Sequence, residues 1–140
     1  PVEVIRDYQT TGLSLKNHPL AFLRDKLTAL GARPSRDIRD ARVSPHGSRG
    51  RVAGLALFRQ RPGTAKGVIF VTLEDETGRA DLILRPHIAQ RFRNIAFFST
   101  AMIATGRVER QGRVVHLLVD GLADLDDTLR DMPMLSRDFR

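Results

Sequence analysis

The sequence contains no cysteine, so neither a disulfide framework nor a zinc site built from thiolates can form. No apolar stretch is long enough to cross a membrane, and no signal peptide is visible. The four histidines are scattered without the spacing of metal ligands. We therefore expect a cytoplasmic location, no membrane partner, no metal site and no cofactor for this chain.

Catalytic arrangements are also missing from the sequence. The stretch "EDETG" (74–78) holds three adjacent acids, but adjacent side chains point in different directions, whereas two-metal catalysis needs carboxylates that converge from separate strands. A solvated turn closed by Gly78 is the better interpretation. The stretch "GTAKG" (63–67) lacks the spacing of a phosphate-binding loop, and no nucleophile–base pair is evident. This chain by itself is therefore predicted not to be an enzyme.

Positive charge is abundant and unevenly distributed. The formal net charge is +7, and 20 of the 23 basic residues are arginine. Residues 33–66 hold nine basic residues against two aspartates, whereas residues 120–131 hold five aspartates against one arginine. A basic half followed by an acidic tail favours a polyanionic partner such as nucleic acid. An arginine-rich composition can equally reflect a GC-rich genome.

The length of 140 residues fits one domain with flanking segments. Residues 1–49 are predicted to form a helical and connecting segment that precedes this domain. Its helix begins at Asn17, which can act as the N-cap, continues through a leucine series to Leu30, and ends at Gly31. Residues 32–50 are polar and broken by proline and glycine, as is typical of a connector.

A mainly β domain is predicted over residues 50–120. Apolar and alternating runs indicate five strands and one helix. The strands are expected at 51–58, 67–73, 79–85, 100–109 and 114–119, and the helix at 86–98. Three strands, one helix and two strands is the order of the five-stranded OB-fold barrel, whose helix plugs one end. Residues 121–140 would follow the barrel as a short acidic helical tail.

Barrels of this kind bind ligands on strands two and three and on the loops that join strands one to two and four to five. Both loops are basic here. Alternation along the strands places the wholly apolar sets inside the barrel and Phe70, with its polar neighbours, outside. Phe70 is expected either to stack on a base or to be covered by other parts of the chain. The residues predicted to bind DNA are Arg59, Arg61, Lys66, Phe70, Thr72, Arg79, Arg107, Arg110 and Arg113.

Three stretches carry a resemblance to a known family: "LSLKNHPLAFLRDKL", "VAGLALFRQRPGTAKGVIFVTLEDETGRADLILRP" and "ATGRVERQGRVVHLLVDGLADL". They resemble the C-terminal region of bacterial C-family DNA polymerases, the alpha subunits of DNA polymerase III. "RQRPGTAKGVIFVTLEDETG" and the closing "SRDFR" are most similar to the error-prone, damage-inducible branch that works in a mutasome. The resemblance covers the chain from about Leu13 onward. One departure is Arg85, where error-prone relatives often carry an aromatic residue before the proline.

The resemblance implies that residues 50–120 hold single-stranded template near the core of a polymerase that serves DNA replication, DNA repair and translesion synthesis. The catalytic carboxylates of that family lie outside this sequence, so the parent chain would be a nucleotidyltransferase while this fragment would not. The short tail is similar to the error-prone branch, because replicative relatives continue into a domain that binds the clamp loader. The implied partners are single-stranded DNA, an inactive Y-family-like polymerase and a RecA-like accessory protein.

A protein-interaction module is the alternative interpretation. The acidic stretch 120–131, or the apolar residues Met132, Met134 and Leu135, could dock the polymerase to mutasome partners on a surface distinct from the DNA face. An anticodon-binding barrel fits the "EDETG" turn but not the residues that flank it.

Overall fold

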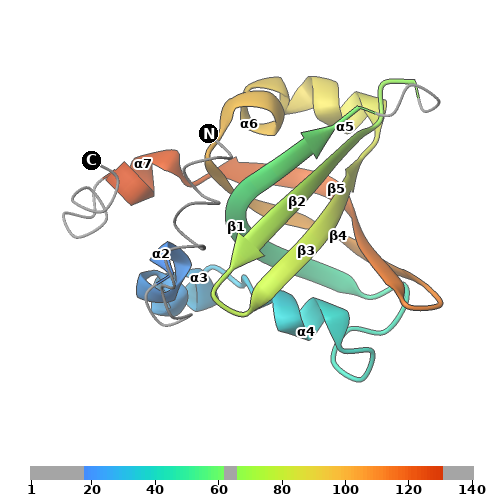
Figure 1. Cartoon of the computed structure of the whole chain (residues 1–140), viewed down its shortest axis with the longest axis horizontal. Coiled ribbons are helices and arrows are strands. Elements are labelled where there is room, and N and C mark those ends of the chain that lie inside the picture. The colour runs from blue at the N-terminus through green and yellow to red at the C-terminus, as the bar shows by residue number, and fades with distance from the viewer. Residues whose placement is uncertain (1–17, 62–65, 131–140) are drawn as a thin grey trace.

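Five strands close into one barrel in the order β1-β2-β3-β5-β4 (Figure 1). They are β1 (Arg49–Gln60), β2 (Ile69–Asp75), β3 (Gly78–Leu84), β4 (Ala101–Gln111) and β5 (Val114–Asp124). The computed structural model describes residues 18–61 and 66–130. The predicted barrel and its strand order are confirmed.

Strand β5 extends beyond its predicted end at Val119. The dipeptide Asp120-Gly121 is typical of a turn, but in the structure Asp120 is the extra residue of a β-bulge. On either side of it, Thr105 of β4 pairs with Gly121, and Gly106 pairs with Val119. The strand therefore continues past the glycine to Asp124.

The barrel closes because β1 is long and curved. Its first half pairs with β4, from Arg49 to Leu55, and its second half pairs with β2, from Leu55 to Gln60. Gly54 lies where the pairing changes, and a Cβ there would lie 2.8 Å from the Leu73 Cβ. Strands β3 and β5 close the barrel through a short parallel pairing, of Leu82 and Ile83 with Leu117 and Leu118.

Alternation along β2 and β3 sorts the side chains as predicted. Ile69, Val71 and Leu73 of β2 are buried in the barrel core, while the residues between them are partly exposed. Ala80, Leu82 and Leu84 of β3 join the same core. This period of two is what a strand with one buried face requires.

Helices cover both ends of the barrel. Helices α5 (Pro86–Arg91) and α6 (Arg93–Phe98) occupy the place of the single predicted helix, with a break at Phe92, and bury Ile88, Ala89 and Ala96 in the core. At the opposite end α4 (Ser35–Arg39) places Ile38 in the core (Figure 1). The sequence interpretation of 32–50 as a connector missed α4, because a helix this short leaves almost no periodic signal.

Two further helices lie against the outer surface of β1 and β4. Leu20 of α2 (Pro19–Phe22), Leu27 of α3 (Arg24–Ala29) and Leu23 between the two helices join a second apolar cluster that includes outward-facing residues of both strands. Leu30, predicted to continue this series, is exposed because the helix ends before it.

The cap predicted for the first helix also differs. Asn17 lies outside the described residues, and the His18 ring accepts a hydrogen bond from the Leu20 amide at 3.1 Å instead. Gly31 follows α3 with a φ of 85°, which confirms it as the predicted stop.

Helix α7 (Asp126–Arg130) follows β5 directly. None of the described helices is both long enough and apolar enough to span a membrane.

Candidate nucleic-acid interface

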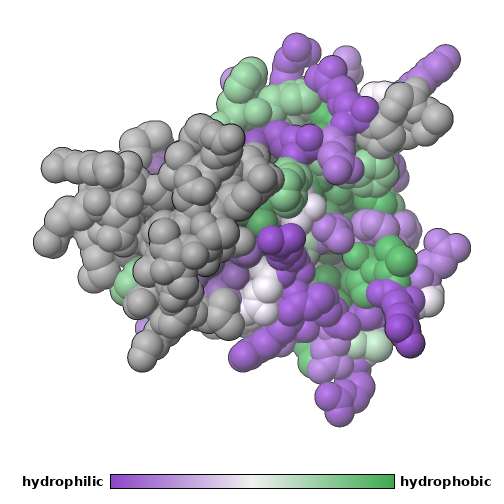
Figure 2. Space-filling model, viewed as in Figure 1, coloured by the Kyte–Doolittle hydropathy of each residue, from purple (hydrophilic) through white to green (hydrophobic). Residues whose placement is uncertain are grey.

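An apolar band crosses the outer surface of three neighbouring strands. Phe70 of β2 pairs with Ile83 of β3, and Ile83 pairs with Leu118 of β5. All three side chains are half-buried and belong to neither apolar cluster. Figure 2 shows polar and apolar side chains intermixed on the side that carries β2 and β3. The band thus places apolar side chains among polar neighbours on the outer face, and Phe70 is its aromatic member, on which a base could stack.

The predicted outward residues Phe70 and Thr72 both lie on this face. Thr72 donates a hydrogen bond to Asp81 on the neighbouring strand at 3.0 Å. The alternation along β3 identifies Ile83 as outward-facing from the sequence. Leu118 could not be found in this way, because only the pairing between β3 and β5 places it beside Ile83.

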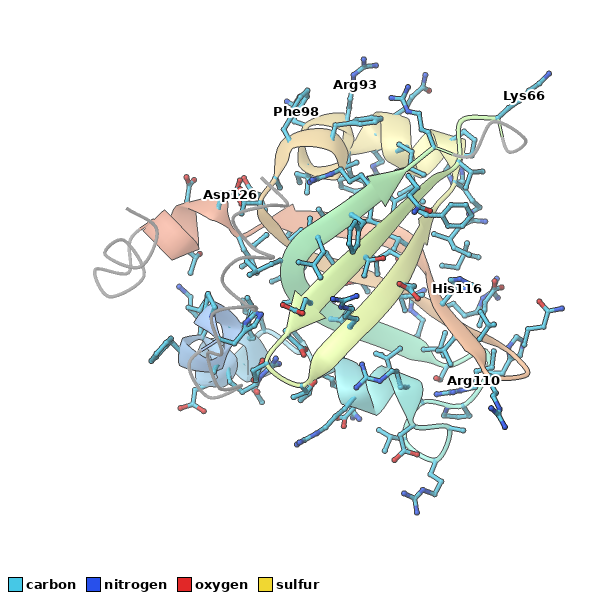
Figure 3. The ribbon with its side chains drawn as sticks, in the orientation of Figure 1. Lys66, Arg93, Phe98, Arg110, His116 and Asp126 are labelled. Carbon is cyan, nitrogen blue, oxygen red and sulfur yellow. The ribbon has the colours of Figure 1, made fainter. Side chains whose placement is uncertain are left out.

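Two cations border the band at the loop that joins β1 to β2. Arg61 and Lys66 are both exposed at the ends of this first loop, which spans 61–68. Residues 62–65 of this loop lie outside the described residues. Lys66 projects into solvent (Figure 3). The Arg61 guanidinium lies over the ring of Phe97 on α6, with its carbon 4.8 Å from the ring centre.

An arginine-lined groove lies near the other loop, between β3, α4 and the start of β5. Its volume is about 360 Å³, and Arg39, Arg79, Arg113 and Asp81 contribute its charged side chains. Arg39 donates to the backbone carbonyls of Arg79 and Thr77, at 2.6 and 3.0 Å. The structure thus brings Arg79 and Arg113 together and adds Arg39, which sequence reasoning placed in a connector.

Arg59 does not face the surface with its predicted partners. A β-bulge at Leu57 shifts the register of β1 against β2, so Arg59 pairs with the core residue Val71. Its guanidinium donates to the carbonyls of Ala96, at 2.7 Å, and of Ser99, and thereby holds the C-terminal end of α6. Burial lowers the pKa of this guanidinium, against a smaller opposite effect of Asp126. A phosphate would therefore have to compete with these carbonyls for the Arg59 guanidinium.

Arg110 has a similar structural role at the other end of the barrel. It donates to the carbonyls of Ile38 at 2.5 Å, Arg39 at 3.2 Å and Ser44 at 2.8 Å, which holds the end of α4 and the chain that follows. Arg113, two residues beyond Gln111 in the hairpin turn, is exposed. Of the predicted cations at this hairpin, Arg113 is thus the one that faces solvent.

Arg107 lies at the far side of the apolar band. It is exposed on β4, where its Cα partners are Leu118 and Arg49. Arg49 forms an ion pair with Asp120 at 2.5 Å. The hydrogen bond from Arg49 lowers the pKa of Asp120, and the charge of Arg107 adds to this effect. The band therefore ends in a cluster with a net positive charge.

The acidic turn was predicted to be solvated, and this is wrong. Asp75 is 1% exposed and accepts hydrogen bonds from the amide and hydroxyl of Ser35 at 2.7 and 2.8 Å. It also accepts from the amide and hydroxyl of Thr77 at 2.8 and 2.7 Å. Ser35 and Asp75 are about forty positions apart, so spacing along the sequence could not reveal their contact.

The neighbouring acids bind the same N-terminal segment. Arg24 donates to Glu76 through Nε at 2.7 Å and Nη2 at 2.8 Å, and His18 contacts Glu74 at 3.1 Å. Burial raises the pKa of the Glu76 carboxyl, but the hydrogen bonds and charge of Arg24 outweigh burial and hold the pKa below its usual value. The turn fastens residues 18–35 to the barrel.

The acidic stretch after the barrel is also largely committed to internal contacts. Asp120 pairs with Arg49, and Asp124 accepts from the Ser99 hydroxyl at 3.1 Å. Asp126 accepts from the amides of Thr100 and Ala101 at 2.9 and 2.8 Å. These internal contacts compete with the role in binding a partner protein that was predicted for the acidic stretch. Asp131, Met132, Met134 and Leu135 lie outside the described residues. Within 18–61 and 66–130, no three His, Cys, Asp or Glu side chains are grouped to hold a metal ion.

The chain is similar in sequence to curated error-prone DNA polymerases. It is 47% identical to the error-prone DNA polymerase of Rhodopirellula baltica over 138 residues, which is 99% of this chain. It is also 47% identical to the enzyme of Xanthomonas oryzae pv. oryzae over 137 residues, and 45% identical to that of Caulobacter vibrioides over 134 residues. The chain spans 12% of the length of each of these relatives. No protein-family model matches the chain.

Among solved structures, the fold is similar to that of asparaginyl-tRNA synthetase from Pyrococcus horikoshii. The TM-score is 0.50 at 20% identity, over 66% of this chain and 25% of that chain. A likeness at this identity shows the fold alone. Together with the closed five-stranded barrel, it identifies the domain as an OB-fold barrel, as predicted.

Proposed function

This chain is the counterpart of a C-terminal region of bacterial error-prone DNA polymerases, and from this premise we propose that it binds single-stranded DNA. The strand crosses the apolar band of Phe70, Ile83 and Leu118. The observation that carries the proposal is this band, flanked by exposed cations at the first loop and at the arginine-lined groove. A protein that binds a single strand of any sequence needs an apolar surface for the bases and cations on either side of it for the phosphates.

The cations divide into two classes with respect to this function. Arg61, Lys66 and Arg113 are exposed and bind phosphates in the proposal, together with Arg79 in the groove and Arg107 beyond the band. Arg59 and Arg110 serve chiefly to hold the helices that close the barrel, because their guanidinium groups already donate to internal carbonyls. A phosphate would have to compete with these hydrogen bonds.

The relatives support a proposal for the role of this region in a whole protein. The parent chain is a DNA-directed DNA polymerase in this proposal, and this region holds template near its core during translesion synthesis without contributing to catalysis or binding a cofactor. A cytoplasmic location belongs to the same proposal. Contacts with other mutasome proteins would then use surfaces outside the apolar band.

The salt dependence of binding tests the exposed cations. Replacing Arg61, Lys66 and Arg113 together by alanine should reduce the slope of log affinity against log salt by about 0.7 for each phosphate that is no longer neutralised, or about 2 in total. Affinity for a single-stranded oligonucleotide would be measured by fluorescence anisotropy at several salt concentrations.

A matched variant controls for net charge. Lys26, Arg36 and Arg42 are also exposed but lie on α3, on α4 and in the loop that follows α4. Their joint replacement by alanine removes the same charge and should change the slope by less than about 0.7, the value expected for a single phosphate. Equal slopes in the two triple variants would contradict the proposed binding of phosphates by the first three cations.

Phe70 tests the stacking role of the apolar band. Phe70→Ala should weaken oligonucleotide binding by roughly 1–3 kcal/mol, because a base no longer has its stacking partner. The free energy of unfolding should fall by less than about 2 kcal/mol, since the side chain is only half-buried on the outer face. Anisotropy and urea unfolding measure the two quantities. Reduced stability with unchanged affinity would show that Phe70 serves packing alone, and Phe22→Ala on α2 should leave affinity unchanged.

A further inference from the structure

Helix α6 ends in two phenylalanines that differ in environment. Phe97 packs partly against the barrel core, and its ring lies 4.8 Å from the Arg61 guanidinium carbon and 5.8 Å from that of Arg93. The Phe98 ring lies 6.4 Å from Phe97 at an angle of 54°. Phe98 is 77% exposed, more than any other large apolar residue in the described ranges. Phe98 and Arg93 project from α6 away from the barrel (Figure 3).

The fold does not depend on the Phe98 side chain. Helix α6 is anchored by the buried Ala96 and by Ile95, which packs against the core. Its C-terminal carbonyls are held by Arg59. This solvated aromatic ring contributes little to packing and is therefore available for contact with a ligand.

Charge around the ring favours a nucleic acid. Residues 86–98 contain no aspartate or glutamate, while Arg91 and Arg93 are exposed on the two helices. Arg61, at the start of the first loop, reaches across to Phe97 and connects this helix with the proposed DNA face. Cations beside an exposed aromatic ring match the phosphates and bases of a single strand, and no acidic residue of 86–98 opposes their charge.

We propose that Phe98 is a second stacking platform, on which a base of the single strand lies after the strand has passed the first loop. This inference rests on the proposed function and extends its binding surface from the barrel onto α6. Arg61 and Arg93 neutralise the phosphates on either side of that base. The cation–π contacts with Phe97 keep both guanidinium groups near the platform.

Oligonucleotides of two lengths distinguish binding at Phe98 from binding at the apolar band. Sites on OB-fold barrels cover about 4–16 nucleotides. Phe98→Ala should weaken binding of an oligothymidine of about 16 nucleotides by about 5- to 150-fold, as expected when one base is no longer stacked. It should leave binding of an oligothymidine of about 4 nucleotides unchanged, since the band alone accommodates that strand. The thermal midpoint of unfolding should not change.

A fluorescence signal gives an independent readout. The chain has no tryptophan, so Phe98→Trp introduces a single reporter. Its emission should be quenched by the long oligonucleotide and not by the short one. Phe22→Trp, on the distant helix α2, should respond to neither.

The outcomes distinguish this inference from the function on which it rests. If the unaltered chain binds neither oligonucleotide, the proposed function fails and the inference with it. If the unaltered chain binds both, but Phe98→Ala binds the long strand equally tightly and Phe98→Trp is not quenched, then the inference alone is wrong. Phe98 would in that case belong to a protein interface.

Discussion

Replacing Asp75 by alanine should lower the free energy of unfolding by about 3–5 kcal/mol. The carboxylate is almost fully buried and accepts five hydrogen bonds, four of them from the amides and hydroxyls of Ser35 and Thr77. Arg24 also reaches it, at 3.3 Å. Alanine would leave the Ser35 amide buried without its acceptor, and an unsatisfied buried donor costs more than the net value of the hydrogen bond it had made.

Urea unfolding of the variant would measure this decrease, with Asp81→Ala as the control. Asp81 lies on the same hairpin, is exposed and accepts one hydrogen bond, from Thr72. Its replacement should cost about 0.5 kcal/mol or less. A decrease below about 1 kcal/mol for Asp75→Ala would mean that the turn does not fasten the N-terminal segment to the barrel.

Gly106→Ala is expected to destabilise the barrel by about 3 kcal/mol or more. Gly106 is buried on β4, opposite Gly50 of β1 and Val119 of β5. A Cβ at this position would lie 2.7 Å from the Leu118 carbonyl carbon and 2.9 Å from the Val119 Cα, and nearer still to the Leu118 carbonyl oxygen. These are backbone atoms of the bulged strand, so a rotamer change cannot relieve the overlap.

Gly121→Ala is the matched control for this glycine. Gly121 lies on the other side of the same bulge, and a Cβ there would meet no atom of the described residues within 4 Å. Its replacement should change stability by about 0.5 kcal/mol or less. Similar unfolding midpoints for the two variants would show that the β4–β5 crossing can widen, contrary to the expectation for Gly106.

The sequence by itself determined the barrel and the faces of its strands. The alternation of Ile69, Val71 and Leu73 with partly exposed residues is a property of neighbouring positions, so it can be recognised without the fold. The same holds for turns. Gly31 and Gly112 adopt positive φ angles of 85° and 62° where local chemistry places a helix end and a hairpin turn.

Tertiary structure decided what the charged residues do. Arg59 was predicted to bind phosphate as part of the basic first loop, but a single inserted residue in β1 turns it toward the carbonyls of α6. Asp75 was predicted to be solvated, but Ser35 is brought against it by the docking of α4. In both cases the partner is distant in the sequence.

The physical reason is the range over which each property is established. In a strand, successive side chains point to opposite faces, so buried and exposed residues alternate and the pattern can be recognised from adjacent positions. A hydrogen bond requires a particular oxygen within about 3 Å, and which oxygen that is depends on bulges and on the packing of separate elements. The sequence therefore determined where the barrel and its basic loops lie, and only the tertiary structure decided which arginines remain available to a ligand.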